Sequence, residues 1–269
     1  MTGLAPLRFA VSLLTIFPVG RRPIELRPGD SGRAISLAPF VGVLIWLPAA
    51  GIVFLFRVLL DGETSLLVPT LGIAAVAVFS GGLHLDGLAD VGDALASRKP
   101  AAQALAVMKD PHVGALGAAT VFFVTFAQIS TLAMAIARHH GTVTMLTAIM
   151  AGRLAVVLAC RPGIPAASKD GLGASVLGTV SRLRAALVTA AVFALAIAAG
   201  KLEIDGGRFR ESAHAVVAIL AALAIAEVMR RLLVRRFGGL SGDMLGAMLE
   251  VATLVALLFM AARAPMWLH

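Results

Sequence analysis

Long apolar stretches separated by short polar connections occupy most of the chain from residue 37 to residue 262. A helix needs about 20 mostly apolar residues to cross the hydrocarbon core of a bilayer. Seven stretches approach this length: Leu37–Leu60, Leu66–Leu83, Val113–Ala137, Thr142–Cys160, Ala185–Gly200, Ala213–Met229 and Met244–Ala262. Two of them are short, so about six to eight crossings fit the pattern. We therefore predict an all-α, polytopic integral membrane protein with about seven transmembrane helices.

One more apolar stretch, Leu7–Val19, lies near the N-terminus. It is too short to cross a bilayer, and no small-residue cleavage site follows it as in a signal peptide. The stretch predicts a short interfacial or re-entrant helix. Because neither an internal repeat nor a low-complexity segment divides the chain, we expect a single membrane-embedded domain over residues 1–269.

The composition supports a lipid environment. Of the 269 residues, 59% are hydrophobic and 14% are charged, against roughly 45–50% and 25% in soluble domains. The net charge of +8 would suggest a nucleic-acid partner in a soluble protein. In a membrane protein, the same excess is typical of cytoplasmic connections beside anionic headgroups, so we expect a lipid bilayer and no nucleic acid as partner.

The distribution of Lys and Arg predicts the orientation. With a cytoplasmic N-terminus, most basic residues fall in four connections on the cytoplasmic side: 1–36, 84–112, 161–184 and 230–243. The connections on the opposite side are short. Function is therefore expected in the two long connections, 84–112 and 161–184, which both face the cytoplasm.

The first of these connections carries an acidic segment in which Asp86, Asp90 and Asp93 are spaced i, i+4 and i+7. Such spacing places three carboxylates on one helical face, where they repel one another until a cation neutralises them. Hard oxygen ligands of this kind suit Mg²⁺. Apolar residues interleave with the aspartates, which favours an amphipathic helix; a solvated acidic loop is the alternative. The segment predicts a metal site at the membrane surface.

Four blocks of the chain resemble the cobalamin synthase family, formally the adenosylcobinamide-GDP ribazoletransferases. The acidic block, Gly81–Asp90 followed by Asp93, carries most of the resemblance. The stretches Met108–Gly117, Lys169–Gly173 and Ser241–Ala247 resemble further blocks of that family in the same order. The resemblance extends over nearly the whole chain. One departure is that Ala94, rather than glycine, follows the last aspartate.

The resemblance implies a Mg²⁺-dependent enzyme of the bacterial inner membrane, with its active face in the cytoplasm. It would join adenosylcobinamide-GDP to α-ribazole, or to α-ribazole 5′-phosphate, and release GMP. A different membrane phosphotransferase and a transporter are the alternatives. Transporters place ionisable groups near the bilayer midplane, whereas these acids cluster at one cytoplasmic end. A homo-oligomer is compatible with the sequence.

Three residues are candidates for catalysis on this interpretation: Asp243, His84 and Lys109. Asp243 is expected to be a fourth metal ligand or the base that accepts the hydroxyl proton; a helix N-cap is the alternative. His84 directly precedes the acidic cluster, although a structural role is at least as common for such a residue. Lys109 is either a contact to phosphate or a solvated charge.

Two further basic residues are candidates for binding the substrate's phosphates. Arg153 falls within a predicted span, where a charge is expensive unless it is paired. It is expected either to contact phosphate or to pair with a helix carboxylate such as Glu250. Lys169 precedes Gly171 and Gly173, whose backbone amides would cradle a phosphate; a plain turn is the alternative.

Overall fold

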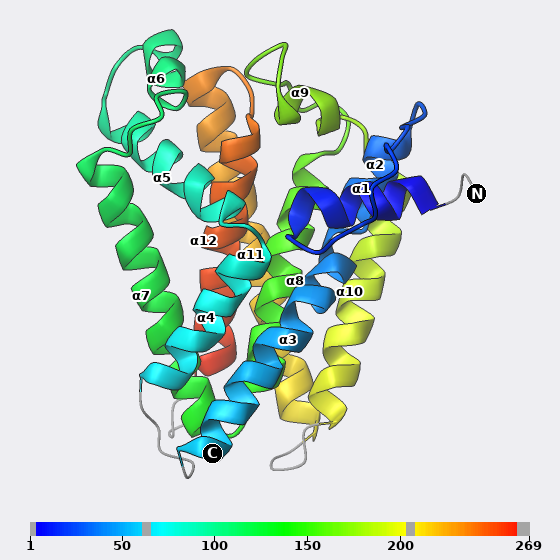
Figure 1. Ribbon diagram of the computed structural model, residues 1–269, viewed down its shortest axis with the longest axis vertical. Helices are drawn as coiled ribbons and strands as arrows, with labels where there is room; N and C mark the ends of the chain where they lie inside the picture. Colours follow the sequence, from blue (N-terminus) through cyan, green and yellow to red (C-terminus); the bar gives the residue numbers. More distant parts are fainter. Residues whose placement is uncertain (1–3, 61–65, 203–207, 263–269) are drawn as a thin grey trace.

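A bundle of long helices forms the body of the protein (Figure 1). The computed structural model describes residues 4–60, 66–202 and 208–262, and within these ranges it contains no β-strand. The helices are α1 Ala5–Leu14, α2 Asp30–Ser36, α3 Ala38–Leu59, α4 Leu67–Phe79, α5 Leu83–Ala96, α6 Ala101–Val107, α7 Ala115–Ala137, α8 Gly141–Ala159, α9 Leu172–Val176, α10 Arg182–Leu202, α11 Arg208–Phe237 and α12 Gly242–Ala261.

Six helices of the described chain are long and apolar enough to cross a membrane: α3, α7, α8, α10, α11 and α12. They confirm six of the seven predicted spans and the all-α polytopic class. The seventh predicted stretch, Leu66–Leu83, corresponds to α4, which together with α5 forms a broken span or a re-entrant loop. Helix α4 has 13 residues, or about 20 Å of length, and the chain then bends by 93° into α5. Gly81 and Gly82 make this bend with φ of 68° and 70°, a backbone region that glycine enters without strain.

Helices α8 and α12 form the centre of the bundle and are mostly buried, whereas the other long helices expose most of their surface. They approach closely at Gly152, where an added Cβ would lie 2.7 Å from the carbonyl oxygen of Leu249. In a membrane the hydrophobic effect does not drive helices together, because lipid is as apolar as their side chains. Small residues at such crossings let the two backbones come close enough for strong van der Waals contact. The middle of α12 is therefore packed closely against α8.

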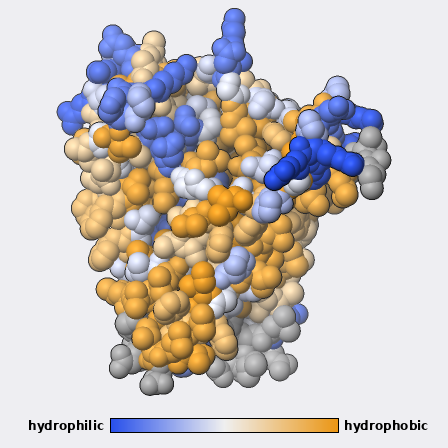
Figure 2. Space-filling model, in the orientation of Figure 1, coloured by the Kyte–Doolittle hydropathy of each residue, from blue (hydrophilic) through white to orange (hydrophobic). Residues whose placement is uncertain are grey.

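The polar surface gathers at the end of the bundle that carries α6 and α9, which we call the site end (Figures 1 and 2). The flanks below it are hydrophobic, as expected of a surface that faces lipid (Figure 2). Helix α1 lies across the bundle rather than along it. It buries Ala10 and Leu14 and exposes Leu7, in agreement with a short interfacial helix near the N-terminus.

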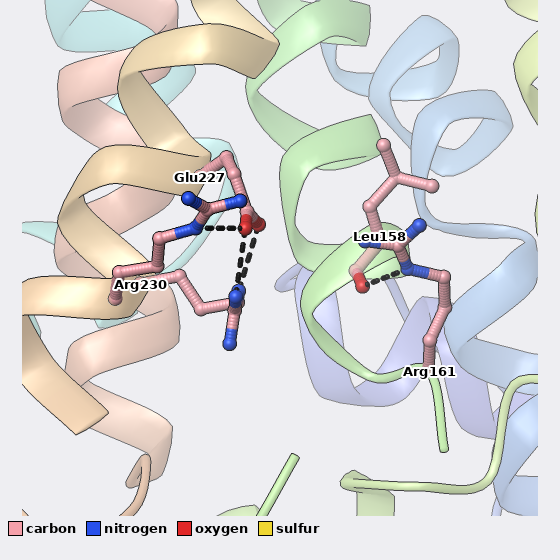
Figure 3. A network of polar contacts seen from close by, with 5 residues as sticks. Leu158, Arg161, Glu227 and Arg230 are labelled. Carbon is pink, nitrogen blue, oxygen red and sulfur yellow. Dashed lines mark hydrogen bonds and ion pairs between the residues drawn. The ribbon is translucent and has the colours of Figure 1, made fainter. Parts of the chain in front are cut away.

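Basic residues from α10, α11 and the connection after α8 meet at the site end. Arg161, Arg182 and Arg230 line one surface groove. The carboxylate of Glu227 accepts two hydrogen bonds of 2.7 Å from Arg230, and Arg161 donates to the carbonyl oxygen of Leu158 at 2.8 Å (Figure 3). The predicted clustering of basic residues at one end of the bundle is thus present in the structure.

Candidate active site

Helix α5 crosses the start of α12, where Gly87 of α5 faces Asp243 and Gly246 of α12 faces His84. A Cβ added to Gly87 would lie 2.6 Å from the carbonyl oxygen of Asp243 and 2.8 Å from its Cα. A Cβ added to Gly246 would lie 3.2 Å from the Cα of His84. Because no side chain separates the two backbones, the acidic segment and Asp243 share one site.

The predicted helix in the acidic segment is present as α5, and the loop alternative is wrong. Asp86 is exposed and Asp90 is half-buried. The carboxylates of Asp86, Asp243 and Asp93 all repel that of Asp90. Four carboxylates from two helices therefore act on one another, and Asp243 belongs to this acidic cluster.

Asp93 has a structural role that its spacing with Asp86 and Asp90 did not reveal. Its carboxylate accepts hydrogen bonds from the backbone amides of Gly114 at 2.6 Å and Gly117 at 2.8 Å. These amides lie at the start of α7, where the first helical N–H groups have no partner within the helix. Asp93 therefore caps α7 and fixes it to α5. Each of its oxygens retains a further lone pair.

The acidic cluster fits a hard cation that takes part of its ligands from a substrate. Within the described residues, no group of three or more His, Cys, Asp or Glu side chains is close enough to enclose a metal by itself. Mg²⁺ is usually held by one or two carboxylates together with water and substrate phosphates. Asp86 and Asp90 offer such carboxylates on one exposed face, next to a broad hollow of about 710 Å³ between α5 and α7.

Asp243 lies in the first turn of α12, and the prediction that it might serve as the N-cap is wrong. Ser241 is the N-cap, because its hydroxyl accepts a hydrogen bond from the amide of Met244 at 3.2 Å. The Asp243 carboxylate is thus not engaged in capping, although the Ser241 hydroxyl lies 3.3 Å from one of its oxygens. A carboxylate in this turn is also stabilised by the helix dipole.

A pocket of about 290 Å³ opens next to Asp243. Of the predicted residues, it brings together Asp243, His84, Lys109 and Arg153. Lys169 does not line it, although its neighbours Ser168 and Asp170 do. The apolar part of the lining comes from several helices and includes Leu13, Leu14, Ile35, Val156, Leu172 and Leu245.

Arg153 is 1% exposed and lacks the pairing that such burial requires. Its Nη1 donates to the carbonyl oxygen of Ile149 at 3.3 Å, but its Nε and Nη2 have no hydrogen-bond partner. The alternative pairing with Glu250 is present only as a longer-range charge attraction between the two side chains, since that carboxylate accepts a hydrogen bond of 2.9 Å from Gln128. Arg153 thus borders the pocket, while its two unpartnered nitrogens are enclosed by surrounding atoms.

Two features of the site lay beyond the sequence motifs. The first is the wall that Leu13 and Leu14 of α1 provide, because nothing local shows that α1 packs against α2 and α3 beside the pocket. The second is the cap that Asp93 places on α7. The only sign of this cap in the sequence is the pair Gly114 and Gly117 near the start of a predicted helix.

Comparisons with known proteins identify the family of the chain. The family model described as cobalamin-5-phosphate synthase matches residues 6–261. The chain is 41% identical to an adenosylcobinamide-GDP ribazoletransferase of Frankia casuarinae, over 96% of this chain and 95% of that protein. It is 33% identical to one of Pseudomonas savastanoi, over 95% and 98%. No solved structure matches the chain. The acidic cluster and its pocket therefore lie in a transferase of the cobalamin-5-phosphate synthase family, to which this chain belongs.

Proposed function

We propose that this enzyme joins adenosylcobinamide-GDP to α-ribazole, or to α-ribazole 5′-phosphate, in a Mg²⁺-dependent reaction that releases GMP. The proposal takes its reactants from the relatives' name and from the family description. The observation that carries it is the crossing of α5 over Asp243 at Gly87. At this crossing Asp86 and Asp90 are the proposed ligands of the metal, and the carboxylates of Asp86 and Asp243 both repel that of Asp90. Asp243 also lines the pocket of about 290 Å³.

The reaction replaces the phosphoanhydride linkage of the diphosphate with a phosphate ester to the acceptor. A hydroxyl oxygen of the acceptor bonds to the phosphorus on the cobinamide side of the diphosphate, and the bond from that phosphorus to the bridging oxygen breaks. The bridging oxygen leaves with GMP. The acceptor's hydroxyl proton passes to Asp243, which is the carboxylate common to the acidic cluster and the pocket.

The residues of α5 would hold the diphosphate through the metal. Asp86 and Asp90 are the proposed Mg²⁺ ligands, and Asp93 contributes a remaining lone pair while it caps α7. The ion supplies neutralisation of the phosphate charge when it is bound. Asp86 is exposed beside the hollow between α5 and α7, which offers space for the bulky donor.

Basic residues at the pocket are proposed to stabilise the charge on the phosphates. Lys109 lines the pocket and is exposed, so it is available to the leaving phosphate. Lys169 is exposed beside the lining residue Asp170 and is proposed for a more distant contact. His84 is buried at the crossing and is proposed to position a hydroxyl rather than to exchange a proton with solvent.

The site end is proposed to face the cytoplasm of a bacterial inner membrane. The clustering of Arg161, Arg182 and Arg230 at this end supports that orientation. The donor is charged and the acceptor is a polar nucleoside or nucleotide, and both would reach the acidic face and the pocket from water without crossing the lipid.

The direct test uses the purified full-length protein in detergent. With Mg²⁺, adenosylcobinamide-GDP and α-ribazole or its 5′-phosphate, we expect GMP and a cobalamin product in equal amounts, measured by liquid chromatography. Folded wild-type protein that releases no GMP from this mixture would rule out the proposed reaction.

A further inference from the structure

The pocket beside Asp243 has a size that selects between the two substrates. Its volume of about 290 Å³ is at the lower limit of ligand pockets, which range over roughly 300–1,000 Å³. The corrin ring of adenosylcobinamide-GDP, with its adenosyl group, is several times larger than this space. Only a group about the size of one nucleoside fits into the pocket.

The lining of the pocket distinguishes the guanosine of the donor from the α-ribazole of the acceptor. Leucine, isoleucine and valine side chains from α1, α2, α8, α9 and α12 form much of its wall. Guanine has hydrogen-bond donors and acceptors around its edge, and an apolar wall leaves them unpaired. The dimethylbenzimidazole ring of α-ribazole has two methyl groups and no N–H donor, so it loses little on burial.

The polar residues of the pocket suit the rest of that nucleoside. Asp243 lines the pocket and belongs to the acidic cluster, so a ribose hydroxyl beside it would be directed toward the diphosphate. The buried Arg153 retains two nitrogens without partners. Because Arg153 also lines the pocket, its positive charge favours oxygen atoms of the sugar or of its phosphate there, which the apolar ring does not offer.

We infer that this pocket is the acceptor subsite, in which the benzimidazole ring of α-ribazole packs against the leucine-rich wall and its ribose reaches Asp243. The inference rests on the proposed function. It places the donor's diphosphate on the acidic face of α5 and the acceptor on the pocket side of Asp243. Acceptor binding then requires no donor and no metal.

Helix α9 offers a matched pair of substitutions for the test. Ala174 and Ser175 are adjacent and both exposed, but only Ala174 lines the pocket. In Ala174→Trp the indole fills part of the pocket, whereas in Ser175→Trp it lies outside. We expect Ala174→Trp to raise the KM for α-ribazole roughly tenfold or more and to leave the KM for adenosylcobinamide-GDP unchanged. Ser175→Trp is expected to change neither constant.

A binding measurement on the same proteins separates this inference from the proposed reaction. The benzimidazole ring fluoresces, so α-ribazole is titrated with wild type and both variants without donor or Mg²⁺. Saturable binding by wild type and Ser175→Trp, weakened in Ala174→Trp, supports the inference. The acceptor subsite is refuted if Ala174→Trp raises only the KM for the donor, or if it binds α-ribazole as wild type does. In either case, GMP release by the wild type would still support the proposed reaction. A wild type that makes no GMP refutes the reaction itself.

Discussion

The substitution Gly87→Ala tests whether the crossing of α5 over α12 is needed for catalysis. The added Cβ would lie 2.6 Å from the carbonyl oxygen of Asp243. An ordinary van der Waals contact begins near 3.4 Å, so the two backbones must separate by about 0.8 Å. The opposing atom belongs to the backbone and cannot rotate away. Overpacking of this kind costs about 1–3 kcal/mol.

The catalytic effect of Gly87→Ala should be measurable in protein that remains folded. A misplacement of about 1 Å between reacting groups lowers turnover by about 10²-fold. We therefore expect kcat for GMP release to fall by that order, with helix content by circular dichroism preserved. The matched control is Gly51→Ala in α3, where an added Cβ meets no atom within 4 Å; alanine there stabilises the helix slightly. A Gly87→Ala enzyme with wild-type kcat would refute the shared site.

The other predictions concern single carboxylates, a cap and the metal. Asp86→Asn should lower kcat about 10²-fold or more without changing the melting temperature. Asp93→Asn should lower the melting temperature as well as kcat, because it weakens the cap on α7, at about 0.5–2 kcal/mol. Ser241→Ala should destabilise α12 by about 1 kcal/mol, seen in thermal unfolding. Dialysis against EDTA should abolish GMP release, and Mg²⁺ should restore it; activity that survives EDTA would contradict the metal.

The sequence predicted the spans well because a membrane imposes a simple requirement of length and apolarity. The exception was the stretch that ends at Leu83. Its hydropathy continues through Phe79 into α5, and hydropathy carries no information about direction. The bend depends on the positive φ of Gly81 and Gly82, which two adjacent glycines permit but do not require.

The acidic cluster was partly predictable. Helical spacing placed Asp86 and Asp90 on one face, and this feature is local. The proximity of Asp243 depends on a contact between residues far apart in sequence, which Gly87 makes possible. The different role of Asp93 depends on α7 packing against α5. Long-range packing of this kind has no local signal, so the capping contact appears only in the folded chain.

The most direct test of the central claim is a Mn²⁺ titration, followed by electron paramagnetic resonance in the presence of adenosylcobinamide-GDP. If the acidic face of α5 holds the metal and diphosphate, wild type should bind Mn²⁺ tightly only with the donor present. Asp86→Asn and Asp90→Asn should each weaken that binding by about 10-fold or more, while the Gly51→Ala control binds as wild type does. Undiminished Mn²⁺ binding by both aspartate variants would contradict the account.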